Sequence, residues 1–267
     1  MSGFQTFRAR IRGARSVVDN LLGKDFEPEI SALPTLLRQG AVCMHIGASD
    51  GRHSYAMVRQ AGAAKVYAFE PSSYSFTALE AAMTLHGLRG KVARYRLAIG
   101  DRDGETILTT PRKTNGHMGR AFAFIGARDA KRSDLAWTGD KEQETVVVTS
   151  VDNFVQRNHI ERIDFIRVDC EGAEGLVLKG AAQTIGKQLP SMLIEIHPVQ
   201  LADLFGSSAQ AVLDTLYGWG YRTFVMASGG RWQEVRAPFA SENAWKDYAC
   251  LHSERHAAQI EALTRPH

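Results

Sequence analysis

The sequence predicts an α/β protein with a mostly parallel, doubly wound sheet and helices on both of its faces. Three observations favour this fold class. Short apolar runs alternate with amphipathic helical segments along most of the 267 residues. A glycine-containing turn joins the first apolar run to a helix, and several later runs end in a carboxylate or a histidine. No internal repeat and no low-complexity tract interrupts the alternation.

The composition is that of an ordinary globular protein, with 44% hydrophobic and 23% charged residues. The length suits one α/β domain over residues 41–267 behind an N-terminal helical extension over residues 1–40. A formal charge of +3 is too small and too dispersed to indicate a nucleic-acid partner. Three cysteines, an odd number, favour buried reduced thiols, and no apolar run reaches the roughly 18 residues of a membrane-spanning helix. We therefore expect a soluble, cytoplasmic protein.

The N-terminal extension begins with an amphipathic segment over residues 4–22. Its apolar residues recur at spacings of three and four, which predicts a helix. They are Phe4, Phe7, Ile11, Ala14, Val18, Leu21 and Leu22, and the interspersed arginines are Arg8, Arg10, Arg12 and Arg15. We expect the apolar stripe to pack against the domain or against a second subunit of a homo-oligomer. The alternative is peripheral attachment to a membrane, because a basic amphipathic helix can lie in an anionic interface. Residues 28–37 predict a second helix.

Residues 41–71 are predicted to form a strand, a turn, a helix and a second strand. The first strand ends at Gly47, a turn of small residues runs to Gly51, and the second strand ends at Glu70. Glycine lets the chain turn sharply and lets a ligand approach the bare backbone, while the N–H groups of the following helix face that ligand. A carboxylate at the tip of the next parallel strand can accept hydrogen bonds from two ribose hydroxyls. The segment therefore predicts half of a nucleoside-binding site.

The spacing of the turn distinguishes between two classes of nucleoside cofactor. Nicotinamide-binding turns read G-x-G-x-x-G, in which the middle glycine makes room for the pyrophosphate. Here Ser49 fills the middle position between Gly47 and Gly51, and no basic residue lies inside the turn. A cofactor with a ribose and no phosphates fits better, and S-adenosylmethionine is the first candidate. A nicotinamide-dependent oxidoreductase remains the alternative.

After Pro71 the alternation of helices and strands continues. Helices are predicted to about residue 86 and over 151–159, 173–185 and 209–218, and strands over 91–99, 106–109, 144–149, 163–169, 192–197, 221–226 and 247–252. The turn after Ile99 lies where an adenine ring would bind. Residues 111–143 are polar and weakly periodic, and a connection of this length suggests a lid or a substrate loop. Asn115 and His117 are its candidate acceptor-binding residues.

Polar groups follow the carboxyl ends of the predicted strands, which is the edge where open α/β sheets bind ligands. These ends carry polar side chains or tight turns: His45 with Gly47, Glu70, Ile99 with Asp101, Asp169 with Glu171, and Glu195 with His197. A single acid at such a position often only caps the next helix. Five positions at one edge indicate a shared site.

Five segments together resemble the FkbM family of S-adenosylmethionine-dependent methyltransferases: VCMHIGASDG, VYAFEP, TSVDNF, IDFIRVDCEGAEGLVLKGA and LPSMLIEIHP. The similarity covers roughly residues 42–198, and residues 164–180 are its most specific part. It implies a class I methyltransferase fold with a seven-stranded sheet, and O-methylation of a hydroxyl, often on a sugar or a polyketide. By motif position it implies cofactor contacts at Gly47, Ala48, Gly51 and Glu70, and an active-site edge at Asp169, Glu171, Glu174, Glu195 and His197.

The predicted site is assembled from both lines of reasoning. Ser49, Pro71, Ile99 and Asp169 join the cofactor-binding residues that the resemblance implies. Glu171 and Glu174 join Asn115 and His117 as candidate acceptor-binding residues. Asp169, Glu195 and His197 are the candidate catalytic residues.

One position departs from the family pattern. His45 stands where the family usually has an acid that orients the glycine turn and the amino group of the cofactor's methionine part. A neutral histidine accepts one hydrogen bond and supplies no negative charge for an ammonium group. This departure is the basis of a third interpretation, a non-catalytic adaptor that keeps the methyltransferase fold.

The expected chemistry is an in-line displacement at a sulfonium, so the protein mainly aligns the acceptor oxygen and removes its proton. His197 is the first candidate base, because its reference pKa lies nearest neutrality, and Asp169 is the second. A divalent ion held by Asp169 and Glu195 is a third route, which would lower the pKa of the acceptor hydroxyl. The sequence thus predicts an O-methyltransferase for a carbohydrate or another small polyhydroxylated acceptor.

Overall fold

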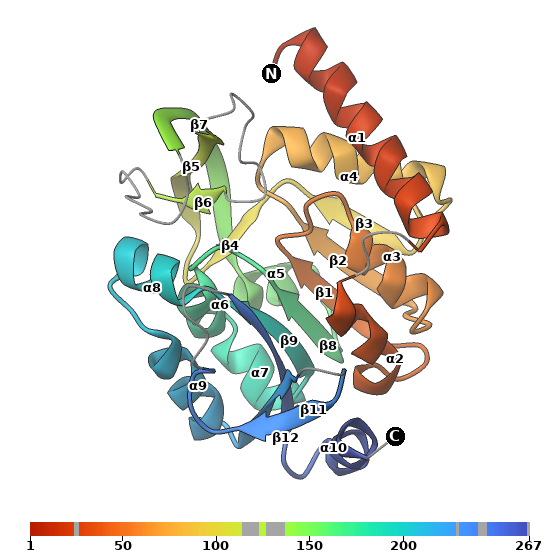
Figure 1. Cartoon of the computed structure of the whole chain (residues 1–267), viewed down its shortest axis with the longest axis vertical. Coiled ribbons are helices and arrows are strands. Elements are labelled where there is room, and N and C mark those ends of the chain that lie inside the picture. Colours follow the sequence, from red (N-terminus) through yellow and green to blue (C-terminus); the bar gives the residue numbers. More distant parts are fainter. Residues whose placement is uncertain (24–26, 114–122, 127–136, 228–229, 240–244, 266–267) are drawn as a thin grey trace.

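The computed structural model describes residues 1–23, 27–113, 123–126, 137–227, 230–239 and 245–265. An eight-stranded sheet lies at its centre, with the strand order β11-β10-β12-β9-β8-β1-β2-β3 (Figure 1). The strands are β1 (Val42–Ile46), β2 (Lys65–Phe69), β3 (Val92–Tyr95), β8 (Phe165–Val168), β9 (Ser191–Ile196), β10 (Tyr221–Met226), β11 (Trp232–Val235) and β12 (Lys246–His252). The doubly wound α/β fold is therefore confirmed, with β11 as one strand more than the seven expected.

Strands β3, β2, β1, β8 and β9 run parallel, whereas β12 pairs antiparallel with β9 and with β10. The chain winds outward from β1 in both directions, so β1 and β8 are neighbours at the point where the winding reverses. Loops diverge at such a point and leave a crevice beyond the carboxyl ends of the strands. This topology positions the candidate site.

Helices cover both faces of the sheet, and alternate residues of each strand face opposite cores. One core contains Cys43, Phe165 and Leu193, with helices η1 (Pro28–Ala32), α2 (Leu33–Leu36), α3 (Arg52–Arg59), α4 (Ser73–Leu85) and α10 (Ala257–Thr264). The other contains Met44 and Ile166, with helices α5 (Val151–Arg157), α6 (Glu174–Gly180), α7 (Ala182–Gln188), α8 (Pro198–Phe205) and α9 (Ala209–Gly218). The strands are apolar on both sides because both sides are buried.

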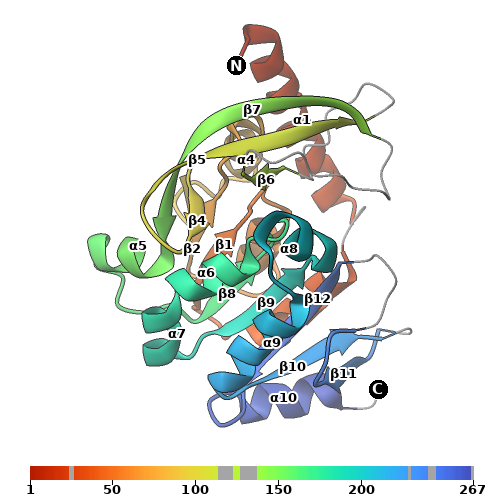
Figure 2. The same ribbon diagram turned by 90° about the vertical axis from the view of Figure 1, so that its left-hand side faces the viewer.

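A second, four-stranded sheet has the order β4-β7-β5-β6 and consists of β4 (Ala98–Gly100), β5 (Gly104–Lys113), β6 (Phe124–Ile125) and β7 (Trp137–Ser150). Figure 2 shows its long strands β5 and β7 arching over the main sheet. The single strand predicted over residues 91–99 is wrong, since its two halves are β3 and β4 in different sheets. Part of the connection predicted over 111–143 instead extends β5 and β7. Asn115 and His117 lie outside the described residues.

Three predicted helices differ in detail from the structure. The helix expected over residues 173–185 is two short helices, α6 and α7, that meet at Ala181. The segment over 28–37 is the 3₁₀ helix η1 followed by one turn of α-helix. The helix expected over 151–159 ends at Arg157. Ser72 and Ser150 cap α4 and α5 as their side chains accept hydrogen bonds from backbone N–H groups.

Helix α1 (Gly3–Leu21) forms as predicted and packs along α4. Its large apolar residues, however, face away from the domain, so the expectation that this stripe packs on the domain is wrong. Within the described residues, no helix combines the length and the apolar character needed to cross a bilayer. All three cysteines are free thiols, two of them buried and Cys170 half-buried.

Candidate active site

The turn between β1 and α3 is held tightly against the neighbouring strands. The N–H groups of Gly47 and Ala48 both donate to the carbonyl of Phe69, at 3.0 and 2.9 Å. Gly47 has a φ of +80°, and a Cβ at this position would lie 1.7 Å from the carbonyl oxygen of Asp169. Only glycine fits there, because the turn passes so close to the end of β8. The glycine turn and the predicted catalytic strand end are therefore one packed unit.

Glu70 lies at the end of β2 and is buried. Its carboxylate accepts hydrogen bonds from the N–H groups of Ser49 and Ser72, at 2.8 and 2.9 Å. Burial raises the pKa of Glu70 to about 7, although these hydrogen bonds act in the opposite direction. The acid predicted to hold a ribose thus also ties the glycine turn to the start of α4.

A cavity of about 220 Å³ lies beyond the carboxyl ends of β1, β2 and β8. Its lining includes most of the predicted cofactor-binding residues, namely Gly47, Ala48, Ser49, Glu70, Pro71, Ile99 and Asp169, together with Glu171. The second sheet contributes an apolar wall of Ala98, Leu108 and Ile125 beside Ile99. The N-terminal extension contributes Arg12 and Glu27. Gly51 does not line the cavity; it adopts a φ of +90° against Leu79 and Met83.

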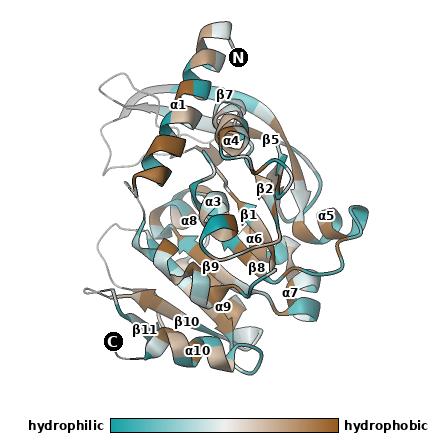
Figure 3. Cartoon of the chain, turned by 90° about the vertical axis from the view of Figure 1, so that its right-hand side faces the viewer, coloured by the Kyte–Doolittle hydropathy of each residue, from teal (hydrophilic) through white to brown (hydrophobic). Residues whose placement is uncertain are grey.

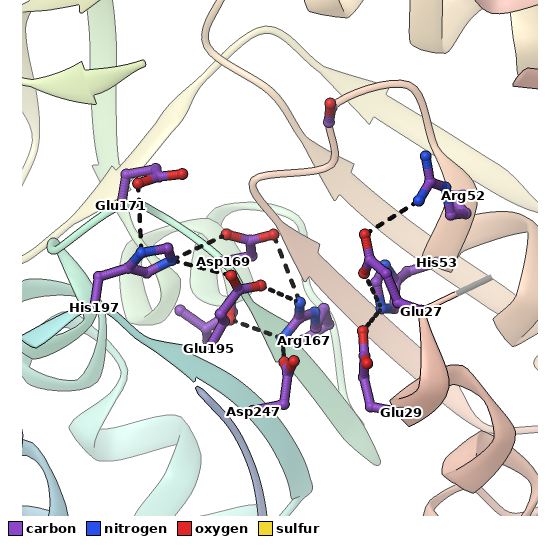
Figure 4. A network of polar contacts seen from close by, with 12 residues as sticks. Glu27, Glu29, Arg52, His53, Arg167, Asp169, Glu171, Glu195, His197 and Asp247 are labelled. Carbon is purple, nitrogen blue, oxygen red and sulfur yellow. Dashed lines mark hydrogen bonds and ion pairs between the residues drawn. The ribbon is translucent and has the colours of Figure 1, made fainter. Parts of the chain in front are cut away.

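At the ends of β8 and β9 the structure brings together Asp169, Glu195 and His197, as predicted (Figure 4). The Nε2 atom of His197 lies 3.7 Å from Asp169 Oδ1 and 3.3 Å from Glu195 Oε1, and its Nδ1 atom lies 3.4 Å from Glu171 Oε2. Burial alone would lower the pKa of His197, but the surrounding carboxylates outweigh it and hold that pKa well above its usual value. At neutral pH this histidine is an imidazolium ringed by acids.

Arg167, in the middle of β8, was not expected from the sequence. Its guanidinium is fully buried and lies 2.8 Å from Glu195, 2.5 Å from Asp247 and 3.5 Å from Asp169. Burial would raise the pKa of Asp169, but His197 and Arg167 together lower it. Burial raises the pKa of Asp247 to about 7 and also raises that of Glu195. An arginine inside an otherwise apolar strand was the one signal in the sequence for this network.

A second carboxylate–histidine cluster lies on the other side of Arg167, as Figure 4 shows. Glu27 and Glu29 come from the N-terminal extension, and each places a carboxylate oxygen 3.5 Å from His53 Nε2. Glu27 also pairs with Arg52 at 3.2 Å. Burial lowers the pKa of His53 to about 3 and raises the pKa of both glutamates. Glu27 and His53 line the cavity, and neither was expected because they meet only in the folded chain.

His45 is buried, and its Nδ1 atom lies 2.8 Å from the hydroxyl oxygen of Ser54. Burial holds the pKa of His45 well below its usual value, so the side chain is neutral. This position, where the resemblance to the FkbM family implies an acid, therefore supplies no charge. Glu27 provides a carboxylate in the lining of the same cavity.

Two groups among the described residues place three possible ligand atoms within 4.8 Å of one another: Asp169 with Glu195 and His197, and Glu27 with Glu29 and His53. In both groups the histidine Nε2 is buried and lacks a hydrogen bond. Carboxylate oxygens and imidazole nitrogen suit divalent ions such as Mn²⁺ or Zn²⁺. The first group fits the metal route expected from the sequence once His197 has released its proton, and Arg167 competes for its carboxylates.

The remaining predicted residues divide between the cavity and the core. Glu171 lines the cavity and contacts His197. Glu174 is fully buried in α6, where its carboxylate accepts a hydrogen bond from the N–H of Gly172 at 2.9 Å and does not line the cavity. Burial raises the pKa of Glu174 to about 7. Its role here is to hold the loop that carries Glu171.

One family model and several solved structures are similar to this chain. The methyltransferase FkbM domain family matches residues 45–223. Among solved structures, methyltransferase FkbM from Methylobacillus flagellatus KT is 16% identical, covering 80% of this chain and 45% of its own, with a TM-score of 0.47. TrmK from M. capricolum, solved with S-adenosylhomocysteine, is 9% identical over 86% of this chain and 69% of its own, with a TM-score of 0.46.

Precorrin-6y C5,15-methyltransferase from Geobacter metallireducens GS-15 is 9% identical, covering 82% of this chain and 84% of its own, with a TM-score of 0.43. No curated protein matches the sequence. The chain spans less than half of the length of the Methylobacillus protein. The family match extends over more than half of the chain and includes the glycine turn, Glu70 and the Asp169–His197 edge. This chain belongs to the FkbM family of S-adenosylmethionine-dependent methyltransferases.

Proposed function

We propose that this methyltransferase transfers the methyl group to a hydroxyl of a carbohydrate or another small polyhydroxylated acceptor. The observation that carries the proposal is the Asp169–Glu195–His197 edge, which adjoins the cavity formed by the glycine turn and Glu70. An alkyl hydroxyl keeps its proton at neutral pH, so its methylation requires a group that removes this proton. A cluster of acids around a histidine suits that requirement.

The residues of the cavity fit the parts of the cofactor. Glu70 would hold the ribose, the backbone of Gly47 to Ser49 would lie along it, and Ile99 with the apolar wall would cover the adenine. Glu27 would supply the negative charge for the ammonium group that His45 cannot supply. When bound, the sulfonium provides an already activated methyl group. The chain itself must then orient the acceptor and remove its proton.

His197 can accept a proton only after it has lost the one that the surrounding acids stabilise. A sulfonium bound in the adjoining cavity would favour this loss, because a nearby positive charge lowers the pKa of an imidazolium. Asp169 is the member of the cluster that lines the cavity, so it would contact the acceptor hydroxyl and orient it. The competent form of the cluster is therefore the one with a neutral His197, and activity should rise with pH.

The test separates chemistry from cofactor binding. His197→Gln and Asp169→Asn should each lower the turnover number by about 10²–10⁴-fold, while the dissociation constant for S-adenosylmethionine changes little. Production of S-adenosylhomocysteine measures turnover on a panel of glycans, polyketides and phenols, and calorimetry measures binding. The matched control is His159→Asn, since His159 is exposed and lies outside the site. Full activity in both variants would place the chemistry elsewhere.

A chelator distinguishes the metal route from the histidine base. If a divalent ion activates the acceptor, EDTA abolishes turnover and Mn²⁺ or Mg²⁺ restores it, and Asp169→Asn is nearly as damaging as metal removal. If His197 is the base, EDTA has no effect. Cofactor binding without turnover on every acceptor class would instead support the non-catalytic adaptor.

A further inference from the structure

Helix α1 is fixed in orientation by close packing of small side chains. Ala9, Gly13, Ser16 and Asn20 are buried and recur at the spacing of one helix face. A Cβ at Gly13 would lie 2.4 Å from the carbonyl oxygen of Ala78 and 2.8 Å from the Cβ of Ala81, so α1 rests directly on the backbone of α4. We call this contact between the buried face of α1 and the backbone of α4 the seam. The seam leaves no room for a larger side chain at Gly13, so α1 cannot rotate to bury its opposite face.

The opposite face of α1 is apolar and open to solvent. Six large side chains along it and just beyond its end are between 52% and 68% exposed: Phe4, Phe7, Ile11, Val18, Leu21 and Leu22. At 100° per residue they form one stripe on the side away from the seam. Figure 3 shows α1 along the outside of the molecule, with its N-terminal end extending past α4. A helix that packed only within its own chain would not place these residues outward.

Arginines border the exposed stripe. Arg8 and Arg15 lie along one side and Arg10 along the other, and all three are exposed. Asp19 is the single acid of α1, and its carboxylate lies 3.6 Å from Arg15. Arg12, the fourth arginine, points inward to Ser49 and Asp50 of the glycine turn, at 3.0 and 3.5 Å. Asp19 is thus the one negative charge within the helix that opposes these arginines, and the surface around the stripe stays positively charged.

We propose that α1 docks the protein on an anionic lipid surface. The helix lies flat in the interface, with its apolar stripe among the acyl chains and Arg8, Arg10 and Arg15 at the lipid phosphates. A second copy of the chain fits the stripe less well, because two such faces would bring their rows of arginine together with only Asp19 to offset them. The proposal does not depend on the identity of the methyl acceptor.

Co-sedimentation of the full chain with phosphatidylcholine vesicles, with and without phosphatidylglycerol, tests this docking. We expect binding only to the anionic vesicles, weakening as salt is added. Replacing Arg8, Arg10 and Arg15 together by Gln should lower the partition coefficient roughly 100-fold. Phe7→Ser and Ile11→Ser should each lower it by roughly tenfold or more. Val147→Thr, a change at an exposed apolar residue of β7, should have no effect.

Two results would overturn the proposal. The first is that the intact chain does not bind anionic vesicles at low salt, or that the arginine variant binds as well as the intact chain. The second is that light scattering shows a dimer that Phe7→Ser dissociates while vesicle binding is absent, which would assign the stripe to a second copy. All of the substituted residues are exposed, so thermal unfolding should show each variant folded and the comparison valid.

Discussion

Two carboxylate–histidine clusters lie on either side of Arg167 (Figure 4). Their histidines have pKa values shifted in opposite directions. The pKa of His197 is held well above its usual value, whereas that of His53 is lowered to about 3. Both imidazoles are buried, so burial cannot explain the difference. His197 faces several acids, of which Asp169 is kept ionised by its partners. His53 faces two glutamates whose own pKa values are raised by burial. Arg167 and Arg52 lower the pKa of His53 further, and the opposing effect of Glu27 is too small to offset them. The balance of acids and arginines around each imidazole therefore decides which histidine is charged.

The two clusters also differ in how the chain builds them. Asp169, Glu195 and His197 end adjacent parallel strands, so the sheet itself brings them together. Glu27 and Glu29 come from the N-terminal extension and reach His53 at the start of α3. The first cluster is thus a product of the fold, whereas the second depends on how the extension packs. Replacing single members of each cluster should show this difference.

The largest effect is expected at Arg167, which both clusters adjoin. Arg167→Met leaves Asp169, Glu195 and Asp247 without their cation and should lower the free energy of unfolding by about 3–5 kcal/mol. The loss should be smaller at pH 5 than at pH 8, because the freed carboxylates can then take up protons. Urea unfolding measures both values. Arg265→Met, which breaks the exposed pair with Glu261, is the control and should leave the free energy of unfolding nearly unchanged.

Comparing variants of Glu27 and Glu29 should distinguish a direct role in cofactor binding from a role in packing the N-terminal extension. Glu27 lines the cavity and Glu29 does not. Glu27→Gln should weaken S-adenosylmethionine binding by more than about tenfold, since a hydrogen bond to a charged group contributes about 1.5–3 kcal/mol. Glu29→Gln should leave the affinity nearly unchanged. Equal effects of both variants in calorimetry would show that Glu27 has no direct part in binding.

The pKa of His53 predicts how stability changes in acid. Between pH 6.5 and 3 the unfolded chain binds a proton at His53 that the folded chain does not, so the free energy of unfolding falls as pH falls. From pH 6.5 to pH 5 this loss is on the order of 2 kcal/mol. His53→Gln should remove it, as measured by urea unfolding at both pH values. Parallel losses in the variant and the intact chain would contradict the assignment.

His197 has the opposite linkage. The stability that it contributes is present below pH 6.5 and is lost as pH rises through its raised folded pKa. Glu171 is the largest cause of that rise. Glu171→Gln should therefore move the midpoint of the pH–rate profile to lower pH and increase the rate below the original midpoint. Glu254→Gln, at an exposed position, is the control. An unmoved midpoint would mean that His197 is not the group that titrates in the reaction.

Local sequence patterns were enough to predict most strands of the main sheet and the edge at which the candidate site residues gather. Apolar runs marked the strands, and the polar residues after each run marked their carboxyl ends. The parallel fold then placed Glu70, Asp169, Glu195 and His197 at one edge. The second sheet was missed, because β4 joins it by pairing residues 98–100 with 148–150, far along the chain. The periodicity of a single segment does not predict which distant strand it pairs with.

The sequence also misled in two places for physical reasons. In α1 the large apolar residues suggested the packed face, but the small ones form it, since Gly13 lets two helices approach more closely than any side chain would allow. In β8 a buried charge was hidden among apolar neighbours, and Arg167 is tolerated only because three carboxylates meet it. Two of these, Glu195 and Asp247, come from strands far along the sequence. A single segment cannot reveal such compensation.

The burial of Glu70 links ligand binding to proton release. With a pKa of about 7, this side chain exchanges between carboxylic acid and carboxylate near neutral pH. A ligand that requires the carboxylate must expel a proton as it enters, so its apparent affinity increases as pH rises towards 7 and levels off above that pH. The heat of binding will then depend on the ionisation enthalpy of the buffer. The strand-end acid that braces the glycine turn thereby makes occupancy of the cavity sensitive to the acidity of the surrounding solution.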